Sequence, residues 1–227
     1  MHAAAEVARE ARDMEPIIFA DRTEAGRLLA EKLEGYRGQD VVVIGLPRGG
    51  LPVARQVADR FGWPLDILVA RKIGAPQHEE FAIGAVTARG TRVLNEAALR
   101  GVMLPPGFVE AASEDQTLKA KEREAMLRAG RPALPLQGRV VILVDDGVAT
   151  GMTLRAAIAD VQAQEPARIV VAAPVIAPET YDALQHLADD VVAISVPALF
   201  FAVGQFYADF TQVTDAEAKE CLVQTTR

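Results

Sequence analysis

The sequence predicts a doubly wound α/β fold, in which helices cover both faces of a parallel sheet. Strand-like apolar runs alternate with helical patterns along most of the 227 residues. Two of these runs, 41–46 and 140–144, are apolar without the alternation of a half-exposed strand. Such runs are typical of central parallel strands, and the connections between them are expected to be right-handed crossovers.

The predicted elements begin with a helix. Asp21 and Glu24 form a helix start signal, and an amphipathic pattern follows them. The apolar strand 41–46 comes next, and after a turn a second helical pattern begins at Leu51. This order of helix, strand, turn and helix agrees with a parallel sheet.

The next segments predict a strand and an insertion. An apolar strand over 65–70 ends at Arg71 and Lys72, whose cations we expect to face a phosphate group. Segments 81–87 and 91–95 flank a short turn that contains glycine, and they predict a hairpin added to the sheet.

A polar helix is predicted over 109–128, between proline- and glycine-containing segments. Its high charge suits a solvated arm or a contact between two copies of the chain. The sequence therefore leaves open whether the protein forms a homodimer.

The second half returns to the alternating pattern. After the strand 140–144, a helix is predicted from Leu154, and strands 168–174 and 190–196 flank a helix near 179–188. A C-terminal segment then holds five of the twelve aromatic residues of the chain: Phe200, Phe201, Phe206, Tyr207 and Phe210.

Composition limits the classes of function. A chain with 50% hydrophobic residues can bury one substantial core, so we expect a tail over 1–18 and a single domain over 19–227. The net charge of −7 argues against non-specific nucleic-acid binding. No apolar run is long enough to span a membrane, and the single Cys221 excludes an intramolecular disulfide. The expected compartment is the cytoplasm.

The most informative segment follows the strand 140–144. Asp145 and Asp146 stand at its carboxyl end, where carboxylates can accept hydrogen bonds from a ligand's vicinal hydroxyls. A loop with glycines and hydroxyls then leads into a helix, and its N–H groups can hold a phosphate. The loop residues are Gly147, Val148, Ala149, Thr150, Gly151, Met152 and Thr153. The alternative is a plain turn in which Thr150 only caps the helix, but this leaves the paired acids unexplained.

A second loop follows the strand 41–46. Gly49 and Gly50 let the backbone approach a ligand closely, and Arg48 supplies a forked cation for phosphate oxygens. The alternative is an ordinary tight turn with a solvated arginine. Because ligands bind beyond the carboxyl ends of parallel strands, we expect the two loops to converge.

The two loops resemble the motifs of type I phosphoribosyltransferases. The acidic pair with its Thr-Gly-Met-Thr loop is similar to the family's binding motif for phosphoribosyl pyrophosphate (PRPP), and Arg48-Gly49-Gly50 resembles the pyrophosphate loop of xanthine-guanine enzymes. From about Phe19 to Leu222 the chain also resembles bacterial phosphoribosyltransferases whose acceptor is unassigned.

The resemblance implies a transferase of nucleotide metabolism. It would move the phosphoribosyl group of PRPP to a small nitrogen acceptor, such as a nucleobase, release pyrophosphate and use Mg²⁺. Asp145 and Asp146 would hold the ribose hydroxyls or organise metal-bound water, with no direct metal ligand assigned. Residues 147–153 would bind the 5-phosphate, and Arg48 with its two glycines the pyrophosphate, helped by Arg71 or Lys72.

The same resemblance implies two covers for the site. In the family, a mobile cover over the active site corresponds to the interval 96–137. This segment could therefore be such a cover, a solvated arm or a contact between two copies of the chain. The C-terminal aromatic segment corresponds to a hood that receives the acceptor, for which Phe200, Phe201, Phe206 and Tyr207 are candidates, although most of these rings are expected to fasten the segment to the core.

One position departs from the 6-oxopurine enzymes of the family. They commonly have an aspartate where this chain has Ala149, and alanine cannot exchange a proton with the base. We therefore expect hypoxanthine and guanine to be poor acceptors. A module that binds PRPP or a nucleotide as a sensor, without turnover, is the alternative function.

Overall fold

A five-stranded parallel sheet forms the centre of the protein. The computed structural model describes residues 17–76 and 78–223, so the predicted tail lies outside the described residues except for its last two positions. In order across the sheet the strands are β2 (Leu65–Ile67), β1 (Val41–Gly45), β6 (Val140–Val144), β7 (Arg168–Val175) and β8 (Asp190–Ser195). All four neighbouring pairs are parallel, which confirms the predicted fold class.

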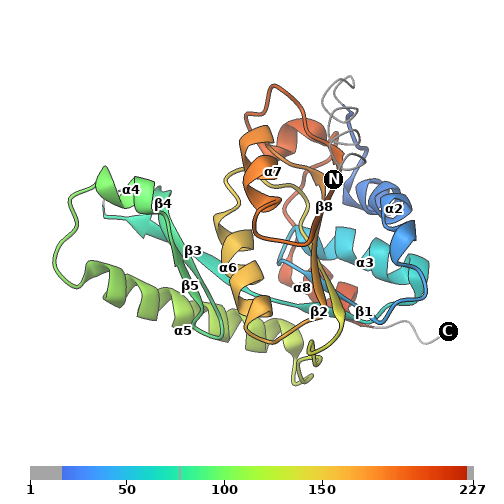
Figure 1. Cartoon of the computed structure of the whole chain (residues 1–227), viewed down its shortest axis with the longest axis horizontal. Coiled ribbons are helices and arrows are strands. Elements are labelled where there is room, and N and C mark those ends of the chain that lie inside the picture. The colour runs from blue at the N-terminus through green and yellow to red at the C-terminus, as the bar shows by residue number, and fades with distance from the viewer. Residues whose placement is uncertain (1–16, 77, 224–227) are drawn as a thin grey trace.

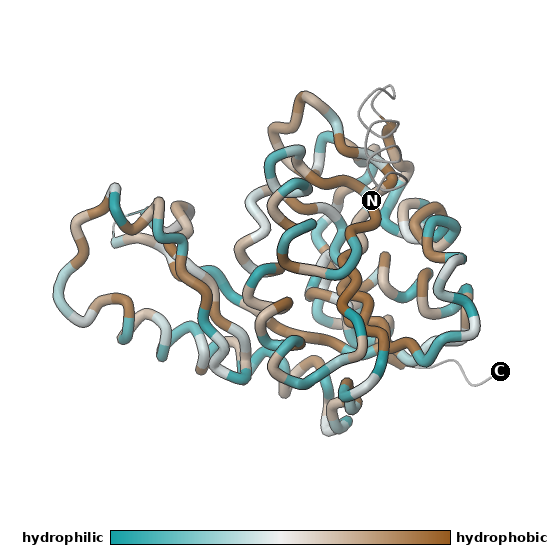
Figure 2. The backbone as a smooth tube through the Cα atoms, viewed as in Figure 1, coloured by the Kyte–Doolittle hydropathy of each residue, from teal (hydrophilic) through white to brown (hydrophobic). Residues whose placement is uncertain are grey.

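Helices cover both faces of this sheet because successive strand residues point to opposite sides. Val41 and Val43 pack in one apolar cluster, whereas Val42 and Ile44 pack in the other. The first face carries α2 (Arg22–Lys32), α3 (Gly50–Phe61) and α8 (Asp215–Leu222), and the second carries α6 (Met152–Gln162) and α7 (Pro178–Leu184) (Figure 1). The tube in Figure 2 shows hydrophobic residues concentrated along the central strands.

The first helix begins where the sequence predicts. The Asp21 carboxylate accepts a hydrogen bond from the backbone N–H of Glu24 at 2.8 Å, which caps α2. A short 3₁₀ turn, η1 (Glu34–Tyr36), then leads toward β1. The cap fixes the position of Arg22, the first residue of the helix.

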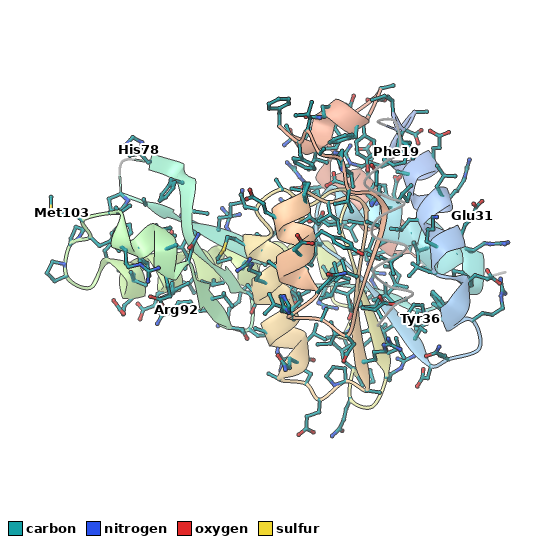
Figure 3. The ribbon with its side chains drawn as sticks, turned by 45° about the horizontal axis from the view of Figure 1, so that its top comes forward. Phe19, Glu31, Tyr36, His78, Arg92 and Met103 are labelled. Carbon is teal, nitrogen blue, oxygen red and sulfur yellow. The ribbon has the colours of Figure 1, made fainter. Side chains whose placement is uncertain are left out.

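An arm extends from the body of the molecule (Figure 1). It consists of a three-stranded antiparallel sheet and two helices: β3 (Ala70–Ala75), β4 (His78–Thr87), β5 (Arg92–Leu94), α4 (Glu96–Arg100) and α5 (Phe108–Arg128). Ile73, Ile83 and Val86 are buried in a small core of the arm's own. Figure 3 labels His78 and Met103 at the far end of the arm, where Met103 is 97% exposed.

Two expectations about this region are wrong. The predicted hairpin forms between β4 and β5, but it belongs to the arm and is not added to the parallel sheet. The predicted strand 65–70 also ends early, because β2 stops at Ile67 and the chain enters β3 at Ala70. Leu68 and Val69 are buried between the two strands, so the apolar pattern continues although the pairing partner changes.

A buried carboxylate ties the arm to the body. The Thr87 hydroxyl at the end of β4 donates to Asp160 of α6 at 2.5 Å, and the Gln164 side-chain amide donates to the same carboxylate at 3.0 Å. Ala85 of β4 also packs against Met152 at the start of α6. The base of the arm is therefore attached to the helix that follows the predicted phosphate loop.

The C-terminal segment lies against the start of the described chain. Phe19 and Tyr207 form an isolated parallel bridge, and the Phe19 N–H donates to the Phe206 carbonyl at 2.8 Å. Phe206 closes the short 3₁₀ turn η2 (Val203–Phe206). None of the helices within residues 17–76 and 78–223 is long and apolar enough to cross a membrane.

Candidate active site

The two predicted loops begin side by side. β1 and β6 are neighbours with Gly45 opposite Val144, so both loops leave the same edge of the sheet. The Leu46 N–H donates to the Val144 carbonyl at 2.9 Å, which extends the pairing one residue beyond β1. The predicted convergence of the loops is confirmed.

Glycine is required where the loops meet. A Cβ built on Gly49 would lie 1.9 Å from Asp146 Oδ2, and one on Gly50 would lie 2.7 Å from the Val144 carbonyl oxygen. The Pro47–Arg48 peptide bond in this loop is cis. The backbone of the first loop thus directly contacts the acidic pair of the second.

The acidic pair brings two carboxyl groups close together. Asp145 Oδ1 accepts a hydrogen bond from the Asp146 N–H at 2.9 Å. Burial of the Asp145 carboxyl, followed by the nearby charge of Asp146, raises the pKa of Asp145 well above its usual value. A cation or a hydrogen-bond donor placed here would relieve this repulsion.

Arg22 belongs to the candidate site, although the sequence did not predict it there. Its Nε donates to Asp146 Oδ2 at 2.7 Å, and the two side chains are only 11% and 13% exposed. Its Nη1 donates to the Thr211 carbonyl at 2.8 Å, and the guanidinium carbon lies 4.0 Å from the centre of the Phe210 ring. The local sequence marks Arg22 only as part of a helix start, so no signal pointed to this contact.

The second loop opens into α6 without a side-chain cap. Gly151 occupies the N-cap position with φ at +68°, and within the part of the chain that the structure describes α6 has no side-chain cap hydrogen bond. Thr150 is exposed and Thr153 is partly exposed. The alternative in which Thr150 only caps the helix is therefore wrong.

Other contacts fix the shape of this loop. The Val148 N–H donates to the Val175 carbonyl at 2.9 Å, and the Thr180 hydroxyl donates to the Ala149 carbonyl. Val148 and Met152 have buried side chains. A Cβ on Gly147 would lie 2.4 Å from Val203 Cγ1, so the loop also touches the C-terminal segment.

The three arginine and lysine residues predicted to face phosphate lie in two different parts of the protein. Arg48 lies in the first loop, and its Nη1 donates to Asp215 Oδ1 of α8 at 3.2 Å. Arg71 and Lys72 lie exposed in β3 of the arm, where Arg71 Nε donates to Gln116 at 2.7 Å. Their predicted place at the end of a parallel strand is wrong, because β2 has already ended, and their role toward phosphate stays a prediction.

The aromatic residues of the C-terminal segment have different environments. Phe206 and Tyr207 are buried, Phe200 is partly buried with its ring centre 5.3 Å from that of Phe206, and Phe201 is 85% exposed. The Tyr207 hydroxyl donates to the Asp146 carbonyl at 2.5 Å, and burial raises its pKa above the ordinary value. Tyr207 thus connects this segment to the acidic pair.

The described residues contain no cluster of three or more His, Cys, Asp or Glu side chains arranged to hold a metal.

Comparison with known proteins identifies the family. A model of the phosphoribosyl transferase domain matches residues 20–211. The chain belongs to this phosphoribosyl transferase family.

Relatives agree with the family assignment. Two curated proteins of Mycobacterium tuberculosis, from strains CDC 1551 / Oshkosh and H37Rv, are provisionally named phosphoribosyl transferases and are each 44% identical over 200 residues. The match covers 88% of this chain and 45% of each relative, so the chain spans about half their length. The crystal structure of TT1426 from Thermus thermophilus is 45% identical, with a TM-score of 0.77, over 91% of this chain and 98% of that chain.

Proposed function

We propose that this phosphoribosyl transferase moves the phosphoribosyl group of PRPP to a nitrogen acceptor and releases pyrophosphate. The observation that carries the proposal is the contact between the two loops, in which Gly49 lies against the carboxylate of Asp146. A ribose held at the acidic pair would have its C1 substituent near Arg48. One donor substrate thus accounts for both loops.

The reaction is a substitution at C1 of the ribose. The bond between C1 and the pyrophosphate oxygen breaks, and its electron pair leaves with pyrophosphate. The lone pair of the acceptor nitrogen forms the new C1–N bond, and the proton of that nitrogen passes to solvent. The negative charge of Asp146 favours the positive charge that develops on the sugar, and Asp145 adds to it when its carboxyl is ionised.

The chain's own residues would bind and orient the donor. The exposed hydroxyl of Thr150 and the uncapped N-terminus of α6 suit the 5-phosphate. Arg48 supplies a forked cation for the leaving pyrophosphate. Arg22 and Tyr207 fix Asp146 from two sides, through its carboxylate and its carbonyl.

The Mg²⁺ that the family implies fits the acidic pair. Asp145 and Asp146 offer adjacent carboxyl groups. Burial and then the charge of Asp146 raise the pKa of Asp145, and a cation would relieve the second of these two effects. These two residues would hold Mg²⁺ directly or through water. When bound, Mg²⁺ supplies charge neutralisation for the leaving pyrophosphate.

The test is a screen for pyrophosphate release from PRPP and Mg²⁺ across nucleobases and other nitrogen acceptors. We expect release with at least one acceptor, and Arg48→Ala to abolish it while binding of ribose 5-phosphate is retained. Arg60→Ala, an exposed arginine at the far end of α3, is the matched control and should keep the activity. Hypoxanthine and guanine should be poor acceptors because Ala149 cannot exchange a proton.

Two results would contradict parts of this proposal. Binding of PRPP without release for any acceptor would contradict a transferase and favour the sensor. Efficient turnover of hypoxanthine or guanine would contradict only the inference from Ala149.

A further inference from the structure

One carboxylate is shared by two arginines beside the first loop. Asp215, the first residue of α8, accepts from Arg48 Nη1 at 3.2 Å and from Arg123 Nη1 at 2.9 Å. Arg123 Nη2 also donates to Asp215 Oδ1. The three side chains come from a loop of the body, from α5 of the arm and from α8, and together they carry one net positive charge.

The cluster is accessible from solvent. The side chains of Arg48, Arg123 and Asp215 are 31%, 26% and 42% exposed. Gly49, the residue next to Arg48, contacts the carboxylate of Asp146. The loop that carries Arg48 therefore adjoins the acidic pair through Gly49.

The position of Arg123 depends on the arm. α5 runs from the arm back to the body (Figure 1), and its packing against α8 brings Arg123 beside the loop of Arg48. Near the end of α5, Arg128 donates to Asp66 of β2, which fastens this part of the helix to the sheet. Arg123 is therefore held by a part of the arm that is firmly attached.

α8 does not need Asp215 for its own attachment. The Thr214 hydroxyl accepts from the Glu217 N–H at 3.2 Å, and the Glu217 carboxylate accepts from the Thr214 N–H at 2.7 Å, which caps the helix. Ala218 and Leu222 are buried in the core of the same face. The carboxylate of Asp215 thus serves mainly the two arginines.

We propose that Arg123 completes the pyrophosphate subsite with Arg48, and that Asp215 is an internal anion that pyrophosphate displaces from both. This inference rests on the proposed function, since pyrophosphate is the leaving group of PRPP. Pyrophosphate has more charge than a carboxylate and more oxygens for two forked cations. Asp215 keeps the guanidinium groups paired in the free protein and competes with the product, so it sets the affinity for pyrophosphate.

The test measures binding of inorganic pyrophosphate, with Mg²⁺, by isothermal titration calorimetry. Asp215→Asn removes the competing charge and keeps the side-chain shape, so we expect pyrophosphate to bind about 2- to 10-fold more tightly, as expected for the loss of two exposed ion pairs. Arg123→Ala should weaken binding by a similar factor. Glu220→Gln makes the same charge change at an exposed position of α8 and should leave binding within about 2-fold of the wild-type protein.

A double variant tests the shared mechanism. If the two arginines act together, Asp215→Asn should give a smaller gain in the Arg123→Ala background than in the wild-type protein. Damage to the fold would weaken binding, so a gain of affinity cannot come from misfolding.

The outcomes separate the inference from the proposed function. If the wild-type protein binds pyrophosphate and Asp215→Asn leaves this affinity unchanged or weakens it, the inference is overturned. It is also overturned if Glu220→Gln gives the same gain in affinity as Asp215→Asn. Both results leave the transferase proposal standing. An unchanged affinity in Arg123→Ala removes Arg123 from the subsite. The absence of pyrophosphate binding by every variant at millimolar ligand overturns the inference together with the leaving-group assignment of Arg48.

Discussion

At the scale of single residues, contacts from three segments converge on Asp146. Its carboxylate pairs with Arg22, its carbonyl accepts from Tyr207, and Gly49 lies against it. We expect Asp146→Asn to weaken PRPP binding about 10- to 100-fold, because a charge-assisted hydrogen bond contributes about 1.5–3 kcal/mol. Calorimetry with PRPP and Mg²⁺ measures this, with thermal melting to establish that the variant is folded. An unchanged dissociation constant in a folded variant would remove Asp146 from the ribose site.

Asp145 makes the stability of the protein depend on pH. Its pKa in the folded protein is raised, chiefly by burial and then by the charge of Asp146. The folded state therefore holds this proton more tightly than the unfolded state, and stability falls as pH rises from about 4, the unfolded value, through the raised pKa. Asp145→Asn removes this loss. Over that pH range, the free energy of unfolding of the variant should therefore rise relative to that of the wild-type protein.

Urea unfolding at a series of pH values measures the difference, with Glu220→Gln as a control at an exposed carboxylate. In the Asp145→Asn variant, the side-chain amide oxygen can still accept from the Asp146 N–H, as the carboxylate does. A difference in stability that is constant with pH, or that falls as pH rises, would contradict the assigned cause of the pKa shift.

At the scale of the elements, Asp160 connects the arm to α6. Its side chain is fully buried, and it accepts hydrogen bonds from Thr87 and Gln164, while the exposed Arg89 lies 3.5 Å away. Asp160→Ala leaves the buried Thr87 hydroxyl without its carboxylate acceptor, so we expect it to lower the free energy of unfolding by about 1–3 kcal/mol. Arg89→Ala removes only an exposed partner and should cost less than about 1 kcal/mol. Equal losses in chemical denaturation would mean that the buried contacts contribute little.

The features that the sequence could predict are those encoded by local patterns within single elements. The strands 41–46 and 140–144 and the loops after them are local patterns, and the rule that parallel strands end at one edge brings the loops together. The departure of the chain at Ala70 into the arm was not predictable, because Leu68 and Val69 keep the apolar pattern through the break.

The missed site contacts are distant in sequence. Arg22 reaches Asp146 across 124 positions, and Arg123 reaches Asp215 across 92. Arg22, Arg123 and Asp215 belong to helices whose local patterns are explained without these contacts. Pairings of this kind depend on how the helices pack around the sheet, which a single sequence does not specify.

At the scale of the whole molecule, the proposed donor site joins segments from both ends of the chain. It includes Arg22 near the start, the two central loops, and Tyr207 in the C-terminal segment. A ligand held between these segments stabilises the folded state by mass action, by about 2.7 kcal/mol at 100 times its dissociation constant. For a chain of this length, 1 kcal/mol corresponds to about 2–4 °C in melting temperature.

We therefore expect PRPP with Mg²⁺, at 100 times its dissociation constant, to raise the melting temperature by about 5–11 °C. Ribose 5-phosphate and pyrophosphate alone should each give a smaller shift at the same concentration, because each occupies only one of the two loops. Thermal-shift measurements with the three ligands provide the comparison. A shift with PRPP no larger than that with ribose 5-phosphate would mean that the first loop does not bind the donor, and the absence of any shift at millimolar PRPP would contradict donor binding by this chain.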